Sequence, residues 1–362
     1  MKTKQIIEGK TKLIVPEKKA KWPESVFYNP EMEKSRTLSI EIVDMFFHGS
    51  KRKIKILDLL SGTGARAVRY ANELVVPCEV YANDVQPSAV RMIEENAKLN
   101  KVQDKMKISA NDANEFLYRN AGCFDCIDID PFGSPIPFTS NAIRALNPER
   151  GVICATATDV GASCGVFKEA CLRKYGTSAA RTSFSYELGL RNLLFALSQQ
   201  ADAAGRSIAP IYVYYSRHYM RIFVEILPGK NKSIPRGSEG FIKYCSKCER
   251  REIISAPQDA GAGAKCLCGG TAKILGPTWI SVLCSEKFAY LDPSLRIAIP
   301  YYDLSALGRA LKKQNKPIDE IIKSLRSAGF AVCRTKMAKQ GIKTDAPYET
   351  VINAVFDSAA KK

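Results

Sequence analysis

The sequence predicts an α/β fold in which a mostly parallel sheet of seven strands is followed by a smaller, basic α+β domain. Two observations lead to this prediction. From Lys53 onward, short apolar segments alternate with helical patterns, which is the order that a parallel sheet covered on both faces requires. Two later apolar segments, 209–215 and 220–226, are separated by only four residues, so they form a hairpin rather than a parallel crossover.

The expected strands of the parallel part are short apolar runs, at 54–60, 79–82, 106–109, 124–129 and 152–156. The segments between them have helical patterns, at 65–74, 87–99, 114–119 and 137–146. Ahead of the sheet, residues 1–21 hold seven lysines and two glutamates and are expected to form a basic, mobile arm. Residues 22–36 are expected to be irregular.

A linker is expected near residues 228–240, where Pro, Gly, Ser and Lys are concentrated. It divides the chain into one domain of residues 1–235 and a second of residues 236–362. In the second domain, residues 317–329 begin with Pro and end with Gly, which indicates a helix. Residues 306–343 hold ten Lys or Arg and only two acids, so much of the positive charge belongs to this domain.

The chain of 362 residues has 54 Lys and Arg against 37 Asp and Glu, a formal net charge of +17. Such a surplus indicates an anionic partner, with nucleic acid the simplest polyanion, although a basic solvated surface has the same composition. The sequence holds no apolar run of about 18 residues and its start lacks the pattern of a signal peptide, so no membrane contact is expected. We expect a cytoplasmic protein without an obligatory protein partner.

A glycine-containing loop follows the first expected strand, in Asp58-Leu-Leu-Ser-Gly62-Thr-Gly64-Ala-Arg-Ala. Gly62 and Gly64 let the backbone turn tightly, and the N-terminus of the next helix offers N–H groups to a ligand. Asp84 ends the second strand, where a carboxylate can accept hydrogen bonds from both ribose hydroxyls of an adenosine. These features by themselves also fit a nicotinamide dinucleotide.

Two further positions favour S-adenosylmethionine. Asp58 precedes the glycines, where its charge would repel a pyrophosphate but could hold the ammonium group of a methionine moiety. Asp112 and Ala113 follow the third strand, a position suited to the amino group of an adenine. With this cofactor, a parallel sheet closed by one antiparallel hairpin strand is the layout of the class I (Rossmann-like) methyltransferases.

An acidic and aromatic motif, Asp130-Pro131-Phe132-Gly-Ser-Pro, comes at the end of the fourth strand. Ligands of doubly wound folds bind at this carboxyl edge of the sheet. An exocyclic amine on a base is a poor nucleophile, because its lone pair is delocalised into the ring. Asp130 and the Pro131 carbonyl can accept both N–H groups of such an amine, and Phe132 can stack on the ring. The alternative is a proline-rich turn with a helix-capping aspartate.

Four of the twelve cysteines cluster, as Cys245-x2-Cys248 and Cys266-x-Cys268. Four thiolates on two tight turns suit a closed, structural zinc site, whose metal binding would be coupled to folding of the module at 241–276. Free thiols or a disulfide remain the alternatives, and the second pair lacks the commoner spacing of two residues. The other eight cysteines are expected to pack as small apolar side chains.

Several stretches together resemble the tRNA (guanine-N2)-dimethyltransferases, which modify the guanine at position 26 of tRNA. The resemblance covers most of the chain and lies in residues 26–32 (Val-Phe-Tyr-Asn-Pro-Glu-Met) with Arg36, 58–66, 83–84, 130–135, 156–159, 164–165, 172–175, 215–219 and 341–344. One departure is that Ser35-Arg36-Thr37 stands where the family usually has Asn-Arg-Asp.

This resemblance implies a set of cofactor contacts from Arg36, Arg66, Asp84, Asp112 and Ala113. It also implies a catalytic Asp130 and a base pocket lined by Phe27 and Phe132. The expected activity is transfer of one or two methyl groups to the exocyclic N2 of a tRNA guanine. The expected small molecules are S-adenosylmethionine and structural Zn²⁺, and the expected partner is tRNA.

Three other functions remain open at this stage. The first is the same chemistry on an adenine or cytosine amine of rRNA or DNA, which similar acid–proline–aromatic motifs serve. The second is a non-catalytic zinc-containing RNA-binding protein, against which the set of Gly62, Gly64, Asp84 and Asp130 argues. The third is a reductase dependent on NADP, whose 2′-phosphate Asp84 would repel.

Overall fold

The computed structural model describes residues 2–17, 26–229, 238–260 and 265–356. Contacts divide the chain into two compact units that alternate along the sequence. Unit 1 comprises Met1–Thr156, Gln200–Ser207 and Phe223–Lys230, and unit 2 comprises Ala157–Gln199, Ile208–Ile222 and Asn231–Lys362. The domain boundary expected at residue 235 stays a prediction, and the expected linker falls largely on 230–237, outside the described residues.

A seven-stranded sheet contains all the strands expected before the linker, in the order β5-β4-β3-β6-β7-β9-β8. Its strands are β3 (Ile54–Asp58), β4 (Cys78–Asn83), β5 (Met106–Ser109), β6 (Cys126–Ile129), β7 (Gly151–Ala157), β8 (Arg206–Ser216) and β9 (Tyr219–Pro228). The pairs β3–β4, β4–β5, β3–β6 and β6–β7 are parallel. Only Arg217 and His218 join β8 to β9, a connection that requires an antiparallel hairpin. The predicted fold class is confirmed.

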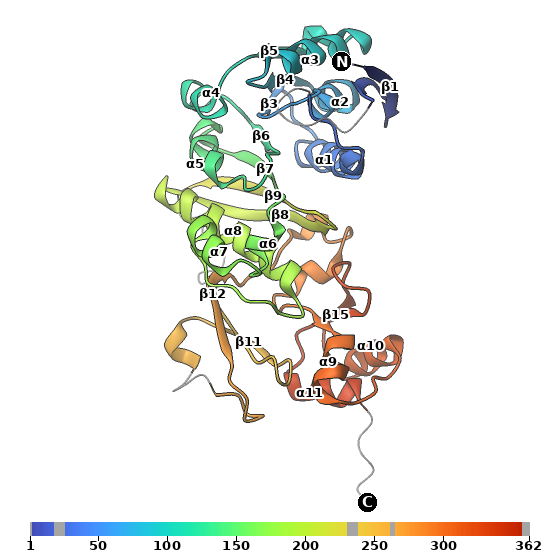
Figure 1. The fold of residues 1–362 in the computed structure, drawn as a ribbon, viewed down its shortest axis with the longest axis vertical. Coiled ribbons are helices and arrows are strands. Elements are labelled where there is room, and N and C mark those ends of the chain that lie inside the picture. Colours follow the sequence, from blue (N-terminus) through green and yellow to red (C-terminus); the bar gives the residue numbers. More distant parts are fainter. Residues whose placement is uncertain (1, 18–25, 230–237, 261–264, 357–362) are drawn as a thin grey trace, which may run out of the picture. The chain divides into compact units, whose positions relative to one another are not determined.

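The helices of unit 1 cover both faces of its strands (Figure 1). Helices α1, α2 and α3 lie on one side and α4 and α5 on the other, as in a doubly wound fold. Their bounds are α1 (Glu33–Phe46), α2 (Ala65–Glu73), α3 (Pro87–Leu99), α4 (Ala113–Arg119) and α5 (Ile136–Ala145). The central strands β6 and β7 are buried at every position because helices cover both faces, whereas β5, at the edge of the sheet, is only partly buried.

The N-terminal segment corrects an expectation. Instead of a mobile arm, it forms an antiparallel hairpin of β1 (Thr3–Glu8) and β2 (Thr11–Pro16). Leu13 and Val15 of β2 are fully buried, and β2 packs on α2 and α3. Burial alternates from Thr11 to Val15 of β2, with Lys12 exposed, which is a strand pattern that the charge count had obscured. The expected irregular segment likewise ends early, because a turn at Pro30–Met32 leads into α1 at Glu33.

Three helices between β7 and β8, which lie wholly or mostly in unit 2, were not predicted from the sequence. They are α6 (Val160–Ser163), α7 (Lys168–Tyr175) and the 19-residue α8 (Ser185–Ala203). A three-stranded antiparallel sheet, in the order β11-β10-β12, follows the residues of the expected linker. Its strands are β10 (Glu239–Tyr244), β11 (Arg251–Ile254) and β12 (Lys273–Trp279), and they carry the cysteine cluster.

The chain ends in a small α+β region, as predicted. Its antiparallel strands have the order β13-β15-β14, with β13 (Tyr302–Asp303), β14 (Val332–Arg334) and β15 (Gly341–Thr344). They share an apolar core with α9 (Leu304–Leu311), α10 (Ile318–Ser327) and α11 (Tyr348–Val355). Helix α10 begins after Pro317 and is followed by Gly329 at φ +85°, the start and end that the sequence had indicated. Among the described residues, no helix is long and apolar enough to span a membrane.

Candidate active site

The strand order of the seven-stranded sheet reverses between β3 and β6. The chain adds β4 and β5 on one side of β3 and later adds β6 and β7 on the other. Asp58, at the end of β3, is the direct register partner of Asp128 on β6, and Asp130 follows β6 immediately. Ligands of doubly wound folds bind at the carboxyl edge beside such a reversal, so the two predicted motifs meet at the expected place.

The loop after β3 has the backbone that its glycines predict. Gly62 and Gly64 have φ values of +54° and +74°, and Gly64 is the N-terminal cap of α2. A Cβ on Gly64 would lie 3.0 Å from Ile93, so a larger residue would also crowd α3. Asp84 braces this loop, because its two carboxylate oxygens accept the backbone N–H groups of Gly62 (2.8 Å) and Gln86 (2.9 Å).

Asp58 is buried with an unsatisfied carboxylate oxygen. Its side chain is 2% exposed, and among the described residues Oδ2 has no hydrogen-bond partner. Burial, together with the negative charges of Asp128 and Asp130, raises the pKa of Asp58 to about 7, although Arg66 opposes the shift. An unsatisfied buried carboxylate is a favourable position for a cationic group of a ligand.

Arg66 of α2 joins the acidic residues of the site. Its Nη2 pairs with Asp130 Oδ2, its Nε lies 3.5 Å from Asp128 Oδ1, and its Nη1 donates to Ser39 Oγ at 3.1 Å. Asp128 is fully buried and also accepts the Tyr70 hydroxyl at 2.8 Å. Asp130 is more accessible, with 21% of its side chain exposed. The arrangement keeps Asp130 at the surface of the site with one oxygen held by a guanidinium.

Two aromatic side chains predicted to line a base pocket meet in the structure. The rings of Phe27 and Phe132 lie edge to face, with centroids 4.6 Å apart and planes at 78°. Both are exposed, at 46% and 63%, whereas Pro131 between the acid and the aromatic is buried. Exposed rings beside a carboxylate form a surface on which a planar base can stack.

Arg36, which is expected to contact the cofactor, makes hydrogen bonds to protein groups through Nε and Nη2. Its Nε and Nη2 donate to the two carboxylate oxygens of Glu8 at 2.7 and 2.5 Å, and Nη2 also donates to the Asn29 carbonyl at 3.1 Å. The Nη1 group has no hydrogen bond among the described residues. Arg36 can therefore present one N–H group to a ligand while Glu8 fixes its orientation.

Asp112 and Ala113 occupy the first positions of α4. One carboxylate oxygen of Asp112 caps the helix by accepting the N–H groups of Asn114 (2.9 Å) and Glu115 (3.1 Å). The preceding Asn111 is hydrogen-bonded through its backbone to Asn83, the neighbour of Asp84. Asp112 is exposed and Ala113 is buried, so a ligand would meet the carboxylate rather than the alanine side chain.

Sequence reasoning missed the residues that support this site. The predicted site residues did not include Glu8, Tyr28, Ser39, Tyr70 or Asp128. One feature of the sequence could have indicated Glu8. It is an isolated acid in a lysine-rich segment, at a position that faces the protein if the segment forms a strand. The other contacts join residues too far apart in the sequence for any local pattern to reveal them.

The four predicted zinc ligands lie together in unit 2. Their sulfur atoms are all within 4.8 Å of one another, with Cys245–Cys268 at 3.6 Å and Cys248–Cys266 at 3.5 Å. Tetrahedral Zn²⁺ with bonds of about 2.3 Å places sulfurs about 3.8 Å apart, so these residues fit the metal. Three of the cysteines are buried and Cys268 is exposed.

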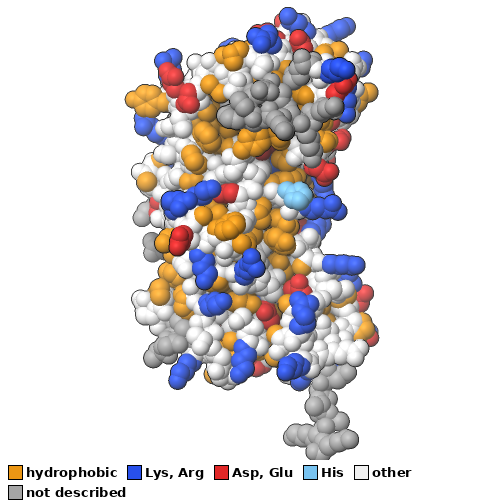
Figure 2. Space-filling model, in the orientation of Figure 1, with side chains coloured by type: hydrophobic (Ala, Val, Ile, Leu, Met, Phe, Trp, Pro, Cys, Tyr) orange, Lys and Arg blue, Asp and Glu red, His pale blue; other side chains and the backbone are white. Residues whose placement is uncertain are grey.

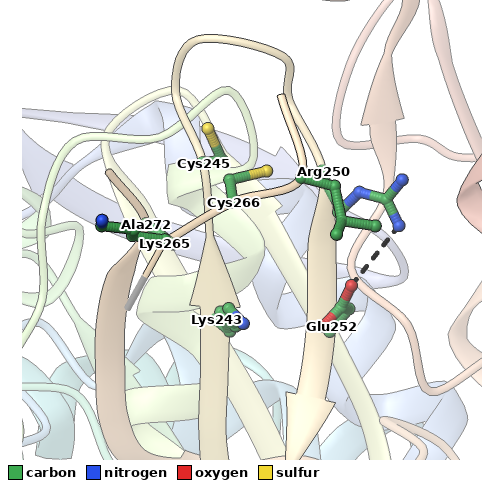
Figure 3. A pocket seen from close by; sticks show the side chains of 8 residues that line it. Lys243, Cys245, Arg250, Glu252, Lys265, Cys266 and Ala272 are labelled. Atoms are coloured by element: carbon green, nitrogen blue, oxygen red, sulfur yellow. Dashed lines mark ion pairs between the residues drawn. The ribbon is translucent and has the colours of Figure 1, made fainter. Parts of the chain in front are cut away.

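A small pocket beside the cysteines is lined by basic side chains (Figure 3). Lys243, Lys265 and Arg250 surround Cys245 and Cys266, and Arg250 pairs with Glu252 at 3.5 Å. Four thiolates around Zn²⁺ would carry a net charge of about −2, which these cations would offset. The charges of the pocket thus agree with a metal centre that has a structural role.

Known proteins resemble this chain over its whole length. The family model for N2,N2-dimethylguanosine tRNA methyltransferase matches residues 9–292 and 289–356. A tRNA (guanine(26)-N(2))-dimethyltransferase of Methanosphaera stadtmanae is 30% identical over 99% of this chain and 97% of its own. The enzyme of the same name from Methanobrevibacter smithii is 32% identical over 97% and 96%.

A solved structure with the same fold is Trm1 from Pyrococcus horikoshii in complex with S-adenosyl-L-methionine. It has a TM-score of 0.82 and 30% identity, and the match covers 97% of this chain and 99% of that one. Together these matches confirm the resemblance and the enzyme class expected from the sequence. The chain belongs to the N2,N2-dimethylguanosine tRNA methyltransferase family.

Proposed function

We propose that this protein transfers methyl groups from S-adenosylmethionine to the exocyclic N2 of guanine 26 in tRNA, once or twice. The names of the full-length relatives support the substrate. The observation on which the proposal rests is the placement of Asp130, Pro131 and Phe132 beside the glycine loop at the reversal of strand order.

The residues of the site fit S-adenosylmethionine. When bound, this group supplies an activated methyl attached to a sulfonium. Asp58 Oδ2, the unsatisfied buried oxygen, would hold the ammonium group, and one N–H of Arg36 would hold the carboxylate. Asp84 already accepts two backbone N–H groups, yet each oxygen retains a lone pair for a ribose hydroxyl. Asp112 has one oxygen beyond its helix cap for the adenine amino group.

The protein's own groups prepare the guanine amine. Asp130 Oδ1 and the Pro131 carbonyl would accept its two N–H groups and so reduce delocalisation of the nitrogen lone pair. Arg66 holds Asp130 Oδ2, which fixes the carboxylate plane. As the nitrogen takes the methyl group, the bond between that carbon and the sulfonium sulfur would break, and its electron pair would stay on sulfur in a neutral thioether. One proton of the amine would pass to Asp130 and then to solvent, which reaches this partly exposed residue. Phe27 and Phe132 hold the ring in line for transfer.

The guanine must leave its stacked position to reach this site. Unstacking costs a few kcal/mol, which stacking on the exposed Phe132 and phosphate contacts would offset. On the face drawn in Figure 2, Lys and Arg side chains are spread over the surface and acidic ones are fewer. Of the ten cations in residues 306–343, eight are exposed, Lys316 is partly buried and Lys343 is fully buried. We assign the exposed cations to the tRNA backbone.

The cysteine cluster would hold a structural Zn²⁺, with Cys245, Cys248, Cys266 and Cys268 as ligands. All four ligand positions would be filled by sulfur, so the metal would have no open position for chemistry. A tRNA substrate also supports the expected cytoplasmic location.

One experiment tests the proposed reaction. The protein is incubated with unmodified tRNA and S-adenosylmethionine carrying a labelled methyl group, and the methylated nucleoside is identified after digestion. Label is expected in mono- and dimethylguanosine at position 26, and Asp130→Ala should abolish transfer while tRNA affinity stays within about twofold of wild type. Label in an adenine or cytosine of tRNA, rRNA or DNA would contradict the substrate assignment. Absence of cofactor binding in calorimetry would favour a non-catalytic RNA-binding protein.

A further inference from the structure

Glu8 is a buried acid at the end of the N-terminal hairpin, and it contacts three residues outside the hairpin. It is 1% exposed, and it accepts hydrogen bonds from Arg36 (2.7 and 2.5 Å) and from the Tyr28 hydroxyl (2.5 Å). Arg69 of α2 lies 3.4 Å away as a second guanidinium. A buried carboxylate that contacts two guanidinium groups and a hydroxyl fixes the relative positions of these three side chains.

Other contacts attach the hairpin to the unit without Glu8. The Thr11 hydroxyl donates to Glu73 at 2.7 Å, the Lys12 N–H to Asn100 at 2.9 Å and the Ile14 N–H to Asn96 at 2.6 Å. Figure 1 shows the hairpin beside α2 and α3, the helices that supply these partners. Glu8 is therefore not needed to dock the hairpin, and its contacts require another explanation.

Those contacts lead to the base pocket. Tyr28 directly follows Phe27 in the sequence. Arg36 contacts the same segment twice: it donates to the Asn29 carbonyl, and its Cζ lies 5.3 Å from the centroid of the Tyr28 ring. The Phe27 carbonyl packs so close to the glycine loop that a Cβ on Gly62 would lie 3.1 Å from it. A shift of Tyr28 or Arg36 would thus move the Phe27 ring that rests against Phe132.

We propose that Glu8 is a positioning residue for methyl transfer: the N-terminal hairpin sets the base pocket through Tyr28 and the cofactor site through Arg36. This inference rests on the proposed function, because Phe27 and Arg36 have their roles only there. Neither the hairpin nor Glu8 touches the reacting atoms; the effect passes through the two residues that Glu8 holds.

The surroundings of Glu8 keep its carboxylate ionised, as the proposed role requires. Burial would raise the pKa of Glu8, but hydrogen bonds and positive charge from Arg36, together with Tyr28 and Arg69, outweigh burial and hold the pKa below its usual value. Glu8 therefore stays ionised across the neutral range. Its replacement by a neutral residue leaves the buried guanidinium of Arg36 without its carboxylate partner, whereas Arg69 keeps its pairing with Glu73.

Three variants separate positioning from simple docking. Glu8→Gln removes the charge, Tyr28→Phe removes only the hydroxyl that donates to Glu8, and Thr11→Val removes a docking bond of the same hairpin as the control. Glu8→Gln is expected to lower kcat/KM for tRNA by about tenfold or more, through kcat, and to weaken cofactor affinity. Tyr28→Phe should lower kcat by a few-fold with cofactor affinity unchanged, because Arg36 is retained. Thr11→Val should stay within about twofold of wild type in both, even where its Tm falls.

These experiments distinguish a failure of this inference from a failure of the proposed function. Wild-type protein that fails to methylate tRNA contradicts the proposed function, whereas active wild type with an unaltered Glu8→Gln contradicts only the role of Glu8. Equal losses in Glu8→Gln and Thr11→Val would also overturn the inference, because docking alone would explain them. Should Glu8→Gln fail to fold, Tyr28→Phe decides: normal kcat in that variant overturns the proposal.

Discussion

At the scale of single residues, the site combines one partly exposed carboxylate with another that is buried beside it. Asp130 is partly exposed and paired with Arg66, whereas Asp58 is buried with an unsatisfied oxygen. Asp58 ends β3 and Asp130 follows the neighbouring strand β6, and the charge of Asp130 contributes to the raised pKa of Asp58. The difference in burial agrees with the different tasks proposed for the two acids, one toward the substrate amine and one toward the cofactor.

The raised pKa of Asp58 predicts a pH dependence of cofactor binding. With a pKa of about 7, Asp58 is mostly protonated at pH 6 and cannot pair with an ammonium group. Calorimetry should therefore show the affinity for S-adenosylmethionine to be about fivefold to tenfold weaker at pH 6 than at pH 7.5. In Asp58→Asn the affinity should be weak at both pH values. A variant that retains the wild-type pH dependence would contradict the assignment.

The raised pKa of Asp58 also makes the stability of the fold depend on pH. A carboxyl whose pKa is raised in the folded state stabilises the fold fully below its ordinary pKa, and this contribution is lost as the pH rises through about 7. Asp58→Asn removes a buried charge at higher pH, so the cofactor-free variant is expected to have a higher Tm than wild type at pH 8. At pH 4 the two proteins should melt at similar temperatures, and a Tm at pH 8 equal to or below that of wild type would argue against the raised pKa.

Single residues were predictable where their chemistry has few other uses. The positive φ values of the glycines, the place of the acid after β6 and the grouping of the cysteines were predicted without tertiary information. The partners of Arg66 and Arg36 were not predictable, because Asp130 and Glu8 lie 64 and 28 residues away from them. An arginine in the sequence shows that a charge is present but not whether a ligand or a carboxylate of the same protein receives it.

At the scale of elements, helix α8 is tied to the C-terminal region by a buried charged network. Glu187 of α8 accepts hydrogen bonds from Arg191 (2.6 Å), from Lys343 of β15 (2.6 Å) and from the Tyr301 N–H (3.1 Å). All three charged side chains are completely buried. Burial lowers the pKa of Lys343 to about 8 even with Glu187 beside it. Glu187 is paired with both cations, and Asp292 adds a weaker electrostatic contribution at Lys343.

This network predicts unequal effects of its members on stability. Glu187→Gln leaves Arg191 and Lys343 buried without their anion and should reduce the free energy of unfolding by about 3–5 kcal/mol. Lys343→Met leaves the Glu187–Arg191 pair intact and should cost clearly less. Urea unfolding followed by circular dichroism compares the two, and an equal or larger loss in Lys343→Met would contradict this account.

The cysteine module predicts a second effect at this scale. Cys248→Ser should lower bound zinc below one ion per chain and destabilise the sheet of β10, β11 and β12, because metal binding and folding are coupled. Zinc content by elemental analysis and Tm are the measurements. Cys333→Ser is the control, since Cys333 is a half-buried cysteine outside the cluster, and it should keep the full metal content. Metal-free wild type with an unchanged Tm would exclude a structural metal.

Elements whose apolar residues recur with a regular period were predicted closely. Elements in which charged residues interrupt or mask this period were missed. Helix α3 has the predicted bounds and α10 lies within its predicted range, because a proline marks the start of each helix and Gly329 follows α10. The hairpin of β1 and β2 was missed because its exposed lysines dominate the composition, although its buried face is apolar. Helix α8 was missed because its buried face includes Glu187, Arg191 and Asn192.

At the scale of the whole molecule, the net charge of +17 indicates binding governed by phosphate contacts. Affinity for tRNA is therefore expected to fall steeply with salt. Replacing Lys312, Lys323 and Lys339, three exposed lysines of the C-terminal region, by Ala should weaken tRNA binding and reduce the slope of log K against log salt by about 0.7 to 0.9 for each phosphate that is no longer neutralised. Cofactor affinity should not change. An unaltered slope would place the tRNA on another surface.

The sequence by itself determined the class of fold and the family, the glycine turn after the first strand of the sheet, the position of Asp130 at a strand end and the grouping of the four cysteines. Each depends on local spacing: strand and helix periods, glycines that must turn, an acid at a strand end and paired cysteines. Tertiary structure alone decided which charges meet. Only the sheet order brings Asp58 against Asp128, and only the packing of the N-terminal hairpin brings Glu8 to Tyr28 and Arg36. Ion pairs between distant segments leave no periodic trace in a sequence, because one contact constrains two residues and nothing between them.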